Sequence, residues 1–142
     1  MIRDEIEIVW APRVLSVLRI IAGLVVWQHG IQKLLHFPNA TAPGPAFGSL
    51  IWFAGALELL LPPLLTLGLF TRPVAFILAG EMAFAYFMSH APRSFYPSVN
   101  GGNLAIMYCF VFFYLAFAGG GPWSLDAILR RNREPQIEPT PR

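Results

Sequence analysis

The 142-residue chain contains 56% hydrophobic and 13% charged residues, and the charged fraction is about half that of an ordinary soluble domain. With a mean hydropathy of +0.56, this composition indicates an integral membrane protein, and at roughly 20 apolar residues per span it leaves room for four spans in the lipid bilayer and no soluble catalytic domain. The net charge of +2 does not indicate nucleic-acid binding, because the basic residues lie at span ends and in the tail.

Residues 1–12 alternate acids with isoleucines and are expected to form an N-terminal cytoplasmic or interfacial segment, for which a short interfacial segment and a frayed tail both remain open. The first predicted span covers about residues 14–36. Its apolar run is long and is interrupted by Arg19, His29 and Lys33, unlike a cleaved signal peptide. We therefore expect it to be retained as a membrane helix.

The next two spans are predicted at about residues 50–70 and 73–90, and each contains one charge, Glu58 and Glu81 respectively. Between them, the run Leu67-Gly68-Leu69-Phe70-Thr71-Arg72-Pro73 predicts a tight turn, because Gly suits a helix end and Pro suits the first helical position. These two spans are expected to be antiparallel neighbours.

The fourth span is predicted at about residues 102–118, before a run of three glycines and a proline. Ser124 is expected to cap a short interfacial helix, and residues 130–142 form a basic, Pro-rich tail that is expected to be disordered and cytoplasmic. The predicted fold is an all-α membrane protein, an antiparallel bundle of four transmembrane helices with a short C-terminal interfacial helix.

Positive charges predict the orientation of the bundle. Most of them lie in the termini or in the turn between the second and third spans, namely Arg3, Arg13, Arg72, Arg130, Arg131, Arg133 and Arg142. The opposite side has little beyond Lys33 and Arg93. Because positive charge accumulates on the cytoplasmic side, both termini are expected there.

Depth estimates bring several polar residues to one level. At about 1.5 Å of rise per residue, His29 and Glu58 each lie about 12 Å inside the outer ends of their spans. Lys33 is one turn further out and reaches either Glu58 or the interface, and Asn103 enters the same outer half. Pro62 removes the helical hydrogen bond to the carbonyl of Glu58, which leaves a further acceptor at this level.

A second polar level is predicted nearer the cytoplasm. Arg19 and Glu81 lie about 9 and 12 Å inside that end of their spans, which makes them a candidate ion pair. Gly30 shares a face of the first span with Arg19 and Lys33, and a small residue on that face predicts the close approach of another helix.

Each of these residues has a structural interpretation beside the functional one. His29 is either a packing histidine or a ligand or proton-relay residue, and Lys33 is either an interfacial anchor or a site residue. Glu58 and Glu81 are either site residues or parts of a buried pair. Tyr108 belongs to an aromatic set that either packs in the core and against lipid or lines a pocket for a flat ring.

Metal and thiol chemistry receive little support from the sequence. Cys109 is the single cysteine and lies in an apolar run, so the chain has no thiol pair and no thiolate metal site. A b-type haem between histidines is a weak hypothesis, because His36 and His90 lie at span ends. We expect neither a metal nor a haem.

Several short motifs together resemble one family. They are His29-Gly30-x-x-Lys33-Leu34, Gly55-x-x-Glu58, residues 67–73 as given above, Met82-Ala83-x-Ala85-Tyr86-Phe87 with His90, Asn100-Gly101-Gly102 and Gly121-Pro122-Trp123-Ser124-Leu125-Asp126. The match runs from about residue 13 to residue 129, and it resembles the DoxX family of small four-helix membrane proteins.

The resemblance implies a bacterial inner-membrane protein related to the DoxD subunit of thiosulfate:quinone oxidoreductase. Carried over by position, the polar set of the family falls on His29, Lys33, Glu58, Arg72, Glu81 and Asn100. The chain departs from the family at Asn103, where Glu is frequent, and this departure weakens any chemistry that needs an acid there.

From the residues and the resemblance together, we expect a membrane subunit of a redox system that binds a quinone or a similar amphipathic molecule. Glu58, His29 and Lys33 are the expected catalytic residues, and Glu81, Asn103 and Tyr108 are expected to join them in binding. Because the chain lacks a thiol pair and a flavin motif, electrons would come from a soluble or membrane redox partner. Two alternatives remain: a non-catalytic scaffold or assembly factor, and a small-molecule transporter, which would need a homodimer.

Overall fold

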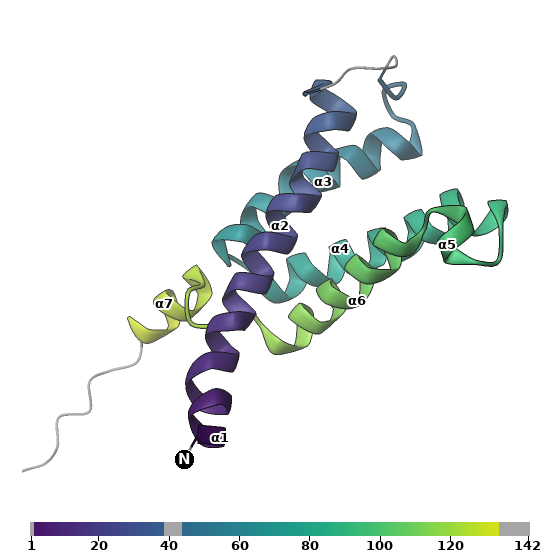
Figure 1. Cartoon of the computed structure of the whole chain (residues 1–142). Helices are drawn as coiled ribbons and strands as arrows, with labels where there is room; N and C mark the ends of the chain where they lie inside the picture. Colours follow the sequence, from purple (N-terminus) through teal and green to yellow (C-terminus); the bar gives the residue numbers. More distant parts are fainter. Residues whose placement is uncertain (1, 39–43, 134–142) are drawn as a thin grey trace, which may run out of the picture.

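The computed structural model describes residues 2–38 and 44–133, and within these residues the chain is helical with no β-strand (Figure 1). The elements in chain order are α1 (Ile2–Glu5), the π-helix η1 (Ile6–Trp10), α2 (Ala11–Leu35), α3 (Leu50–Leu67), α4 (Thr71–Ala85), the π-helix η2 (Tyr86–His90), the 3₁₀-helix η3 (Ala91–Arg93), α5 (Pro97–Asn100), α6 (Asn103–Ala118) and α7 (Leu125–Arg131).

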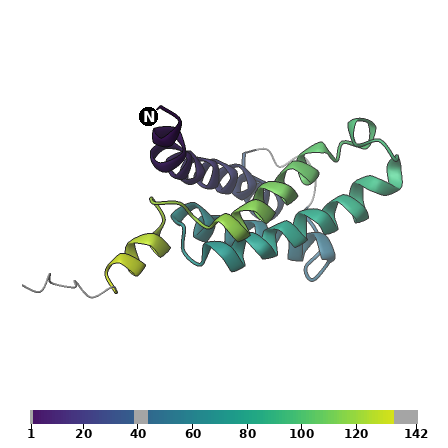
Figure 2. The same ribbon diagram turned by 90° about the horizontal axis from the view of Figure 1, so that it is seen from below.

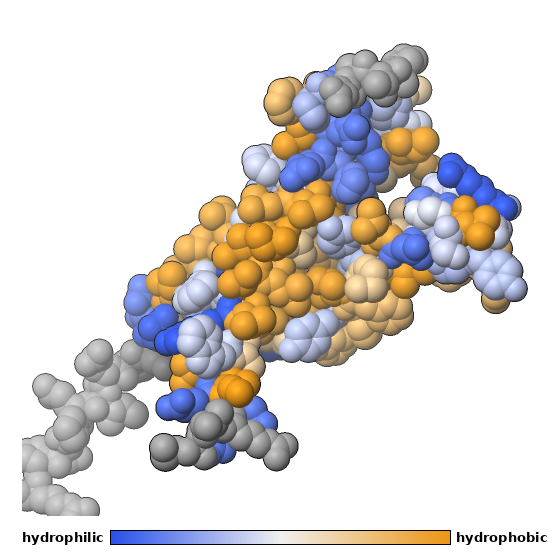
Figure 3. Space-filling view, viewed as in Figure 1, coloured by the Kyte–Doolittle hydropathy of each residue, from blue (hydrophilic) through white to orange (hydrophobic). Residues whose placement is uncertain are grey.

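The membrane-spanning character of the chain is confirmed by its helices. Three continuous helical stretches are long and apolar enough to cross a membrane, namely Ile6–Leu35, Leu50–Leu67 and Thr71–Arg93, and Asn103–Ala118 is a shorter apolar helix. Their outer surface is largely hydrophobic in Figure 3, as expected for a surface that faces lipid. The first of these stretches begins with η1, and α1 precedes it without a break, so the N-terminal segment is helical from Ile2 onward.

The helix ends follow the turn residues of the sequence. Ser49 caps α3 by accepting a hydrogen bond of 3.2 Å from the backbone N–H of Trp52. Gly68 ends α3 with φ of 72°, a conformation that favours glycine, and Thr71 begins α4 three residues later. The predicted tight turn is confirmed, as is the short helix α7, which Ser124 caps at Ala127.

The four long helices form two pairs, with α2 packed along α3 and α4 along α6. The pairs meet through α3 and α4 near the end that carries α1 and α7, which we call the terminal end. Figures 1 and 2 show that they diverge toward the opposite end, which carries the connections that follow α2 and η3 and which we call the loop end. The helices therefore do not pack side by side over their full length as a single closed bundle.

The hydrophobic core lies where the two pairs meet. It contains residues from all four long helices, namely Ala22, Val26, Leu65, Val74, Ala75, Leu78, Ala79, Met82, Phe112 and Leu115. Van der Waals packing of such close-fitting side chains is a main source of helix association inside lipid. The predicted tail falls partly outside the description, because residues 134–142 are not among the described residues.

Candidate functional site

An ion pair joins α2 to α3. The Nζ of Lys33 donates a hydrogen bond of 2.7 Å to Oε1 of Glu58 and lies 2.6 Å from Oε2. The side chain of Lys33 is 35% exposed, whereas that of Glu58 is 5% exposed. Of the two expectations for Lys33, contact with Glu58 is the one that the structure shows. The ammonium group compensates a carboxylate that would otherwise be buried without a counter-charge.

Two glycines allow the backbones of α2 and α3 to approach closely around this pair. A Cβ on Gly30 would collide with the backbone of Glu58 and Leu59, so α2 touches α3 at the residue that carries the carboxylate. From the other side, a Cβ on Gly55 would lie 3.2 Å from the Cβ of Lys33. The predicted close approach at Gly30 is confirmed, and its partner is α3.

Glu81 on α4 is the third member of the group. Its side chain is buried and interacts electrostatically with both Glu58 and Lys33. Among the described residues, no group donates a hydrogen bond to either oxygen of Glu81. Lys33, Glu58 and Glu81, called the acid–lysine cluster below, thus bring three helices together at the junction of the two pairs.

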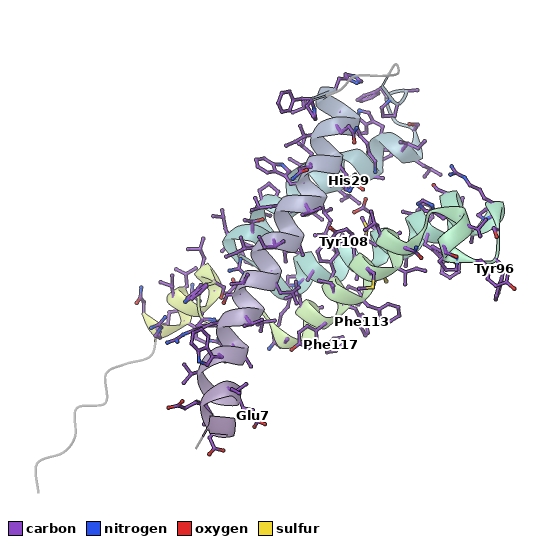
Figure 4. All side chains as sticks on the ribbon, viewed as in Figure 1. Glu7, His29, Tyr96, Tyr108, Phe113 and Phe117 are labelled. Atoms are coloured by element: carbon purple, nitrogen blue, oxygen red, sulfur yellow. The ribbon has the colours of Figure 1, made fainter. Side chains whose placement is uncertain are left out.

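The other predicted site residues lie differently. The side chain of His29 is exposed, and so is that of Asn103 at the start of α6. Tyr108 is half-buried and stacks on Phe112, with ring centroids 5.7 Å apart. Figure 4 shows His29 on α2 and Tyr108 on α6. The structure therefore unites the lysine and both acids of the predicted set and leaves His29 and Asn103 on the surface.

The expected pairing of Arg19 with Glu81 is wrong. Arg19 is fully buried at the terminal end, and its guanidinium donates hydrogen bonds to four backbone carbonyls. Nε donates to Gly120 at 2.8 Å, Nη1 to Leu65 at 2.7 Å and also to Thr66, and Nη2 to Trp123 at 3.2 Å. The carbonyls of the last turn of a helix lack intrahelical donors, so one arginine satisfies the end of α3 and fixes the chain after α6.

The motif that contains Asp126 is a second structural contact at the terminal end. Oδ1 of Asp126 accepts a hydrogen bond of 2.9 Å from the N–H of Phe70, and Oδ2 accepts one of 2.8 Å from the N–H of Thr71. The N–H of Asp126 in turn donates to the carbonyl of Gly68 at 2.9 Å. The carboxylate thereby caps the N-terminus of α4 and ties α7 to the turn between α3 and α4.

Asn100 organises the turn before α6. Its Nδ2 donates to the carbonyl of Ser94 at 2.8 Å, and its Oδ1 accepts from the N–H of Gly102 at 2.7 Å. The carbonyl of Asn100 lies 3.1 Å from Nδ1 of His90. Three residues of the motifs quoted from the sequence, Asn100, Ser124 and Asp126, therefore hold the loops in place.

A groove of about 740 Å³ lies at the terminal end, away from the acid–lysine cluster. Its lining combines α2, α4, α6 and α7 and includes Leu15, Thr71, Arg72, Tyr114, Gly120 and Arg130. Arg72, part of the predicted polar set, is exposed here. Sequence reasoning did not find this groove, because residues far apart in the chain form it and none of them interrupts an apolar run.

Comparison with known proteins adds a family and one relative. The family model described as DoxX matches residues 14–91. A protein of Haemophilus influenzae named "Uncharacterized protein" is 42% identical over 122 residues, which are 82% of this chain and 91% of the relative. No solved structure matches the chain. The matched family segment contains Lys33, Glu58 and Glu81.

Proposed function

Because the chain belongs to the DoxX family, we propose that it is a membrane subunit of a redox system whose acid–lysine cluster binds the polar end of a quinone or a similar amphipathic molecule. The observation that carries this proposal is the cluster itself. Ionisable side chains are costly within the apolar part of a membrane protein and commonly mark a binding or transfer site. Here three of them converge from three helices.

The hydrogen-bonding capacity of the cluster suits a ring that carries oxygen. The ammonium group of Lys33 has three N–H donors, and its Nζ lies close to both oxygens of Glu58, so one donor remains for a ring carbonyl. The oxygens of Glu81 are acceptors for the hydroxyl group of the reduced ring. Tyr108, half-buried on α6, offers an aromatic face. His29 is left out of the proposed site because its side chain is exposed.

The arrangement of the helices offers a route to the cluster. The two pairs diverge toward the loop end, and Figure 3 shows them as two separate arms there. Lys33, the most exposed member of the cluster, lies two residues before the end of α2 at this end. A molecule dissolved in the lipid would approach between the arms with its ring leading.

Electrons in this scheme come from a partner protein. Conversion of a quinone to a quinol takes up two electrons and two protons, and Cys109 is the single cysteine of the chain. The partner therefore supplies the electrons, and the present chain supplies the site in the membrane. We place the protein in the bacterial inner membrane with both termini in the cytoplasm, which is supported by the arginines at the terminal end.

Native mass spectrometry of the protein in lipid nanodiscs tests the proposal. We expect a quinone to stay bound to the wild type after purification from a quinone-containing membrane, and to be lost from Glu81→Gln and Lys33→Met. His29→Gln is the matched control, because it changes an exposed side chain four residues from Lys33 on the same helix. Equal retention by the wild type and both cluster variants would disprove the site. No bound molecule in any sample would favour the scaffold alternative.

A further inference from the structure

We infer that the acid–lysine cluster is a proton-binding site, in which one exchangeable proton is held between the carboxyl groups of Glu58 and Glu81. The inference extends the proposed function, on which it rests for the identity of the site, but it concerns the protein without a ligand. The Lys33–Glu58 ion pair is already neutral without Glu81. The inference therefore gives Glu81 a role of its own, as the second acid that shares the proton.

The charges of the cluster do not cancel unless a proton is present. Lys33 contributes one positive charge, and the ionised forms of Glu58 and Glu81 would contribute two negative charges. Both acids are buried, with whole-residue exposures of 4% and 8%. Solvent screens a net charge poorly in such a position, so an unbalanced carboxylate would be strongly unfavourable. One bound proton restores neutrality.

The geometry also provides the place for this proton. Glu81 on α4 interacts electrostatically with Glu58 on α3, and both carboxyl groups are buried, so the two acids share one poorly solvated environment. Two ionised carboxylates have only acceptors and repel each other, whereas a protonated carboxyl group donates to its ionised neighbour. A proton between the two acids therefore supplies the donor that the oxygens of Glu81 lack among the described residues. The same proton removes the repulsion between the two groups.

The other charged or titratable groups of α2 do not balance the cluster, because Arg19 binds backbone carbonyls at the terminal end and the side chain of His29 is exposed. Glu58 on α3 and Lys33 on α2 are the charged groups that interact with Glu81. The remaining helix packed along α4 is α6, which contains no Asp, Glu, His, Lys or Arg between residues 103 and 118. Its titratable side chains are Tyr108, Cys109 and Tyr114, all neutral at physiological pH in their ordinary forms. The count of one lysine and two acids therefore holds for the whole site.

The exposure gradient indicates how the proton exchanges. Lys33 is one-third exposed, while the two acids behind it are nearly fully buried. Exchange with the surroundings therefore proceeds past the ammonium group of Lys33 at the loop end. A bound quinone that accepts two electrons from a partner needs two protons to become a quinol. The first would be the proton of the cluster, and the second would follow after the anionic acid pair has been reprotonated along the same route.

Infrared difference spectroscopy of the protein in nanodiscs, with no quinone added, tests this inference. The wild type is expected to show one carbonyl stretching band of a protonated carboxyl group at neutral pH, and the band should shift in D₂O. Glu81→Gln and Glu58→Gln should each abolish it, because one acid and one lysine already balance. Lys33→Met should double its intensity, because two acids without the lysine need two protons.

Controls keep the outcomes distinct. Glu7→Gln changes an exposed acid outside the cluster and should leave the band unchanged. Absence of the band in the wild type, or its persistence in both glutamine variants, would overturn the inference even if one variant folds poorly. A band seen in choline chloride and lost in sodium chloride would overturn it in favour of a sodium site. The band in the wild type, together with no quinone retained in the mass-spectrometry experiment, would leave the proton site standing and remove the proposed ligand.

Discussion

The Nζ of Lys33 lies within 2.7 Å of Oε1 and 2.6 Å of Oε2 of Glu58, so a single ammonium group compensates both oxygens of a carboxylate on the neighbouring helix. The contact depends on Gly30, one turn earlier on α2, whose missing Cβ lets the two backbones touch. This relationship between charge and close packing leads to the first two predictions.

Removing Lys33 alone should lower the free energy of unfolding more than removing both Lys33 and Glu58. Glu58→Gln leaves the partly exposed ammonium group of Lys33 balanced by Glu81, whereas Lys33→Met leaves two buried acids with no counter-charge, for which we expect a loss of about 3 kcal/mol. The double variant Lys33→Met/Glu58→Gln should be more stable than Lys33→Met alone. Thermal unfolding in detergent, arranged as a double-mutant cycle, measures the coupling. Strictly additive effects would contradict the pairing.

Gly30→Ala should separate α2 from α3. The added Cβ collides with the backbone of Glu58, which a side-chain rotation cannot relieve, and we expect a destabilisation of about 1–3 kcal/mol. Gly80→Ala is the matched control on α4, because a Cβ there meets nothing within 4 Å. The control should stabilise the protein by up to about 1 kcal/mol through helix propensity. Equal melting temperatures for the two variants would argue against the close contact.

Arg19→Leu should be among the most destabilising single substitutions. It removes the buried donor that four backbone carbonyls share, and leaves those of Thr66 and Trp123 with no other side-chain donor among the described residues, so we expect a loss of more than about 3 kcal/mol. Arg19→Lys should recover part of this loss, since an ammonium group cannot reproduce the planar fork. Arg13→Leu, which removes an exposed guanidinium 5.6 Å from the Trp10 ring, should cost less than about 1 kcal/mol. Chemical denaturation in mixed micelles ranks the three variants.

Asp126 should show a graded response. Its two oxygens each accept one backbone N–H from the start of α4, so Asp126→Asn loses one acceptor and the negative charge, while Asp126→Ala loses both acceptors. We expect the alanine variant to lose about 1–2 kcal/mol and the asparagine variant less. Limited proteolysis between α6 and α7 should speed up in the same order. An asparagine variant as unstable as the alanine variant would show that the charge outweighs the two hydrogen bonds.

Much of the helical structure follows from the sequence by simple physical rules. Apolar runs of membrane-spanning length give the long helices, and Gly68 together with Pro73 marks the turn between α3 and α4. The divergence of the two helix pairs could not be predicted in this way. Apolar faces are equally suited to a neighbouring helix and to lipid, so hydrophobicity does not specify which helices touch.

The position of Glu81 shows where depth estimates fail and how they can be improved. The depth of Glu58 is counted from the outer end of its span, and the depth of Glu81 from the cytoplasmic end of a span of different length. The two acids are therefore assigned to different depths in the membrane. Counting from their shared turn, Glu58 lies ten residues before Gly68 and Glu81 lies ten residues after Thr71, so both are about 15 Å from the turn. This symmetry is a signal in the sequence. The partners of Arg19 could not be predicted from the sequence, because they are backbone carbonyls, which residues of every type carry.

The unbroken helix that starts at Ile2 and ends at Leu35 is longer than a bilayer is thick. At about 1.5 Å per residue it measures about 50 Å, against roughly 30 Å for the hydrocarbon core. It is held along its length, by Gly30 against α3, by Arg19 at the end of α3 and by Pro12 against Gly121. The excess length therefore has to be taken up by tilt or by the first turns, whose exposed acids would stand in the interfacial region.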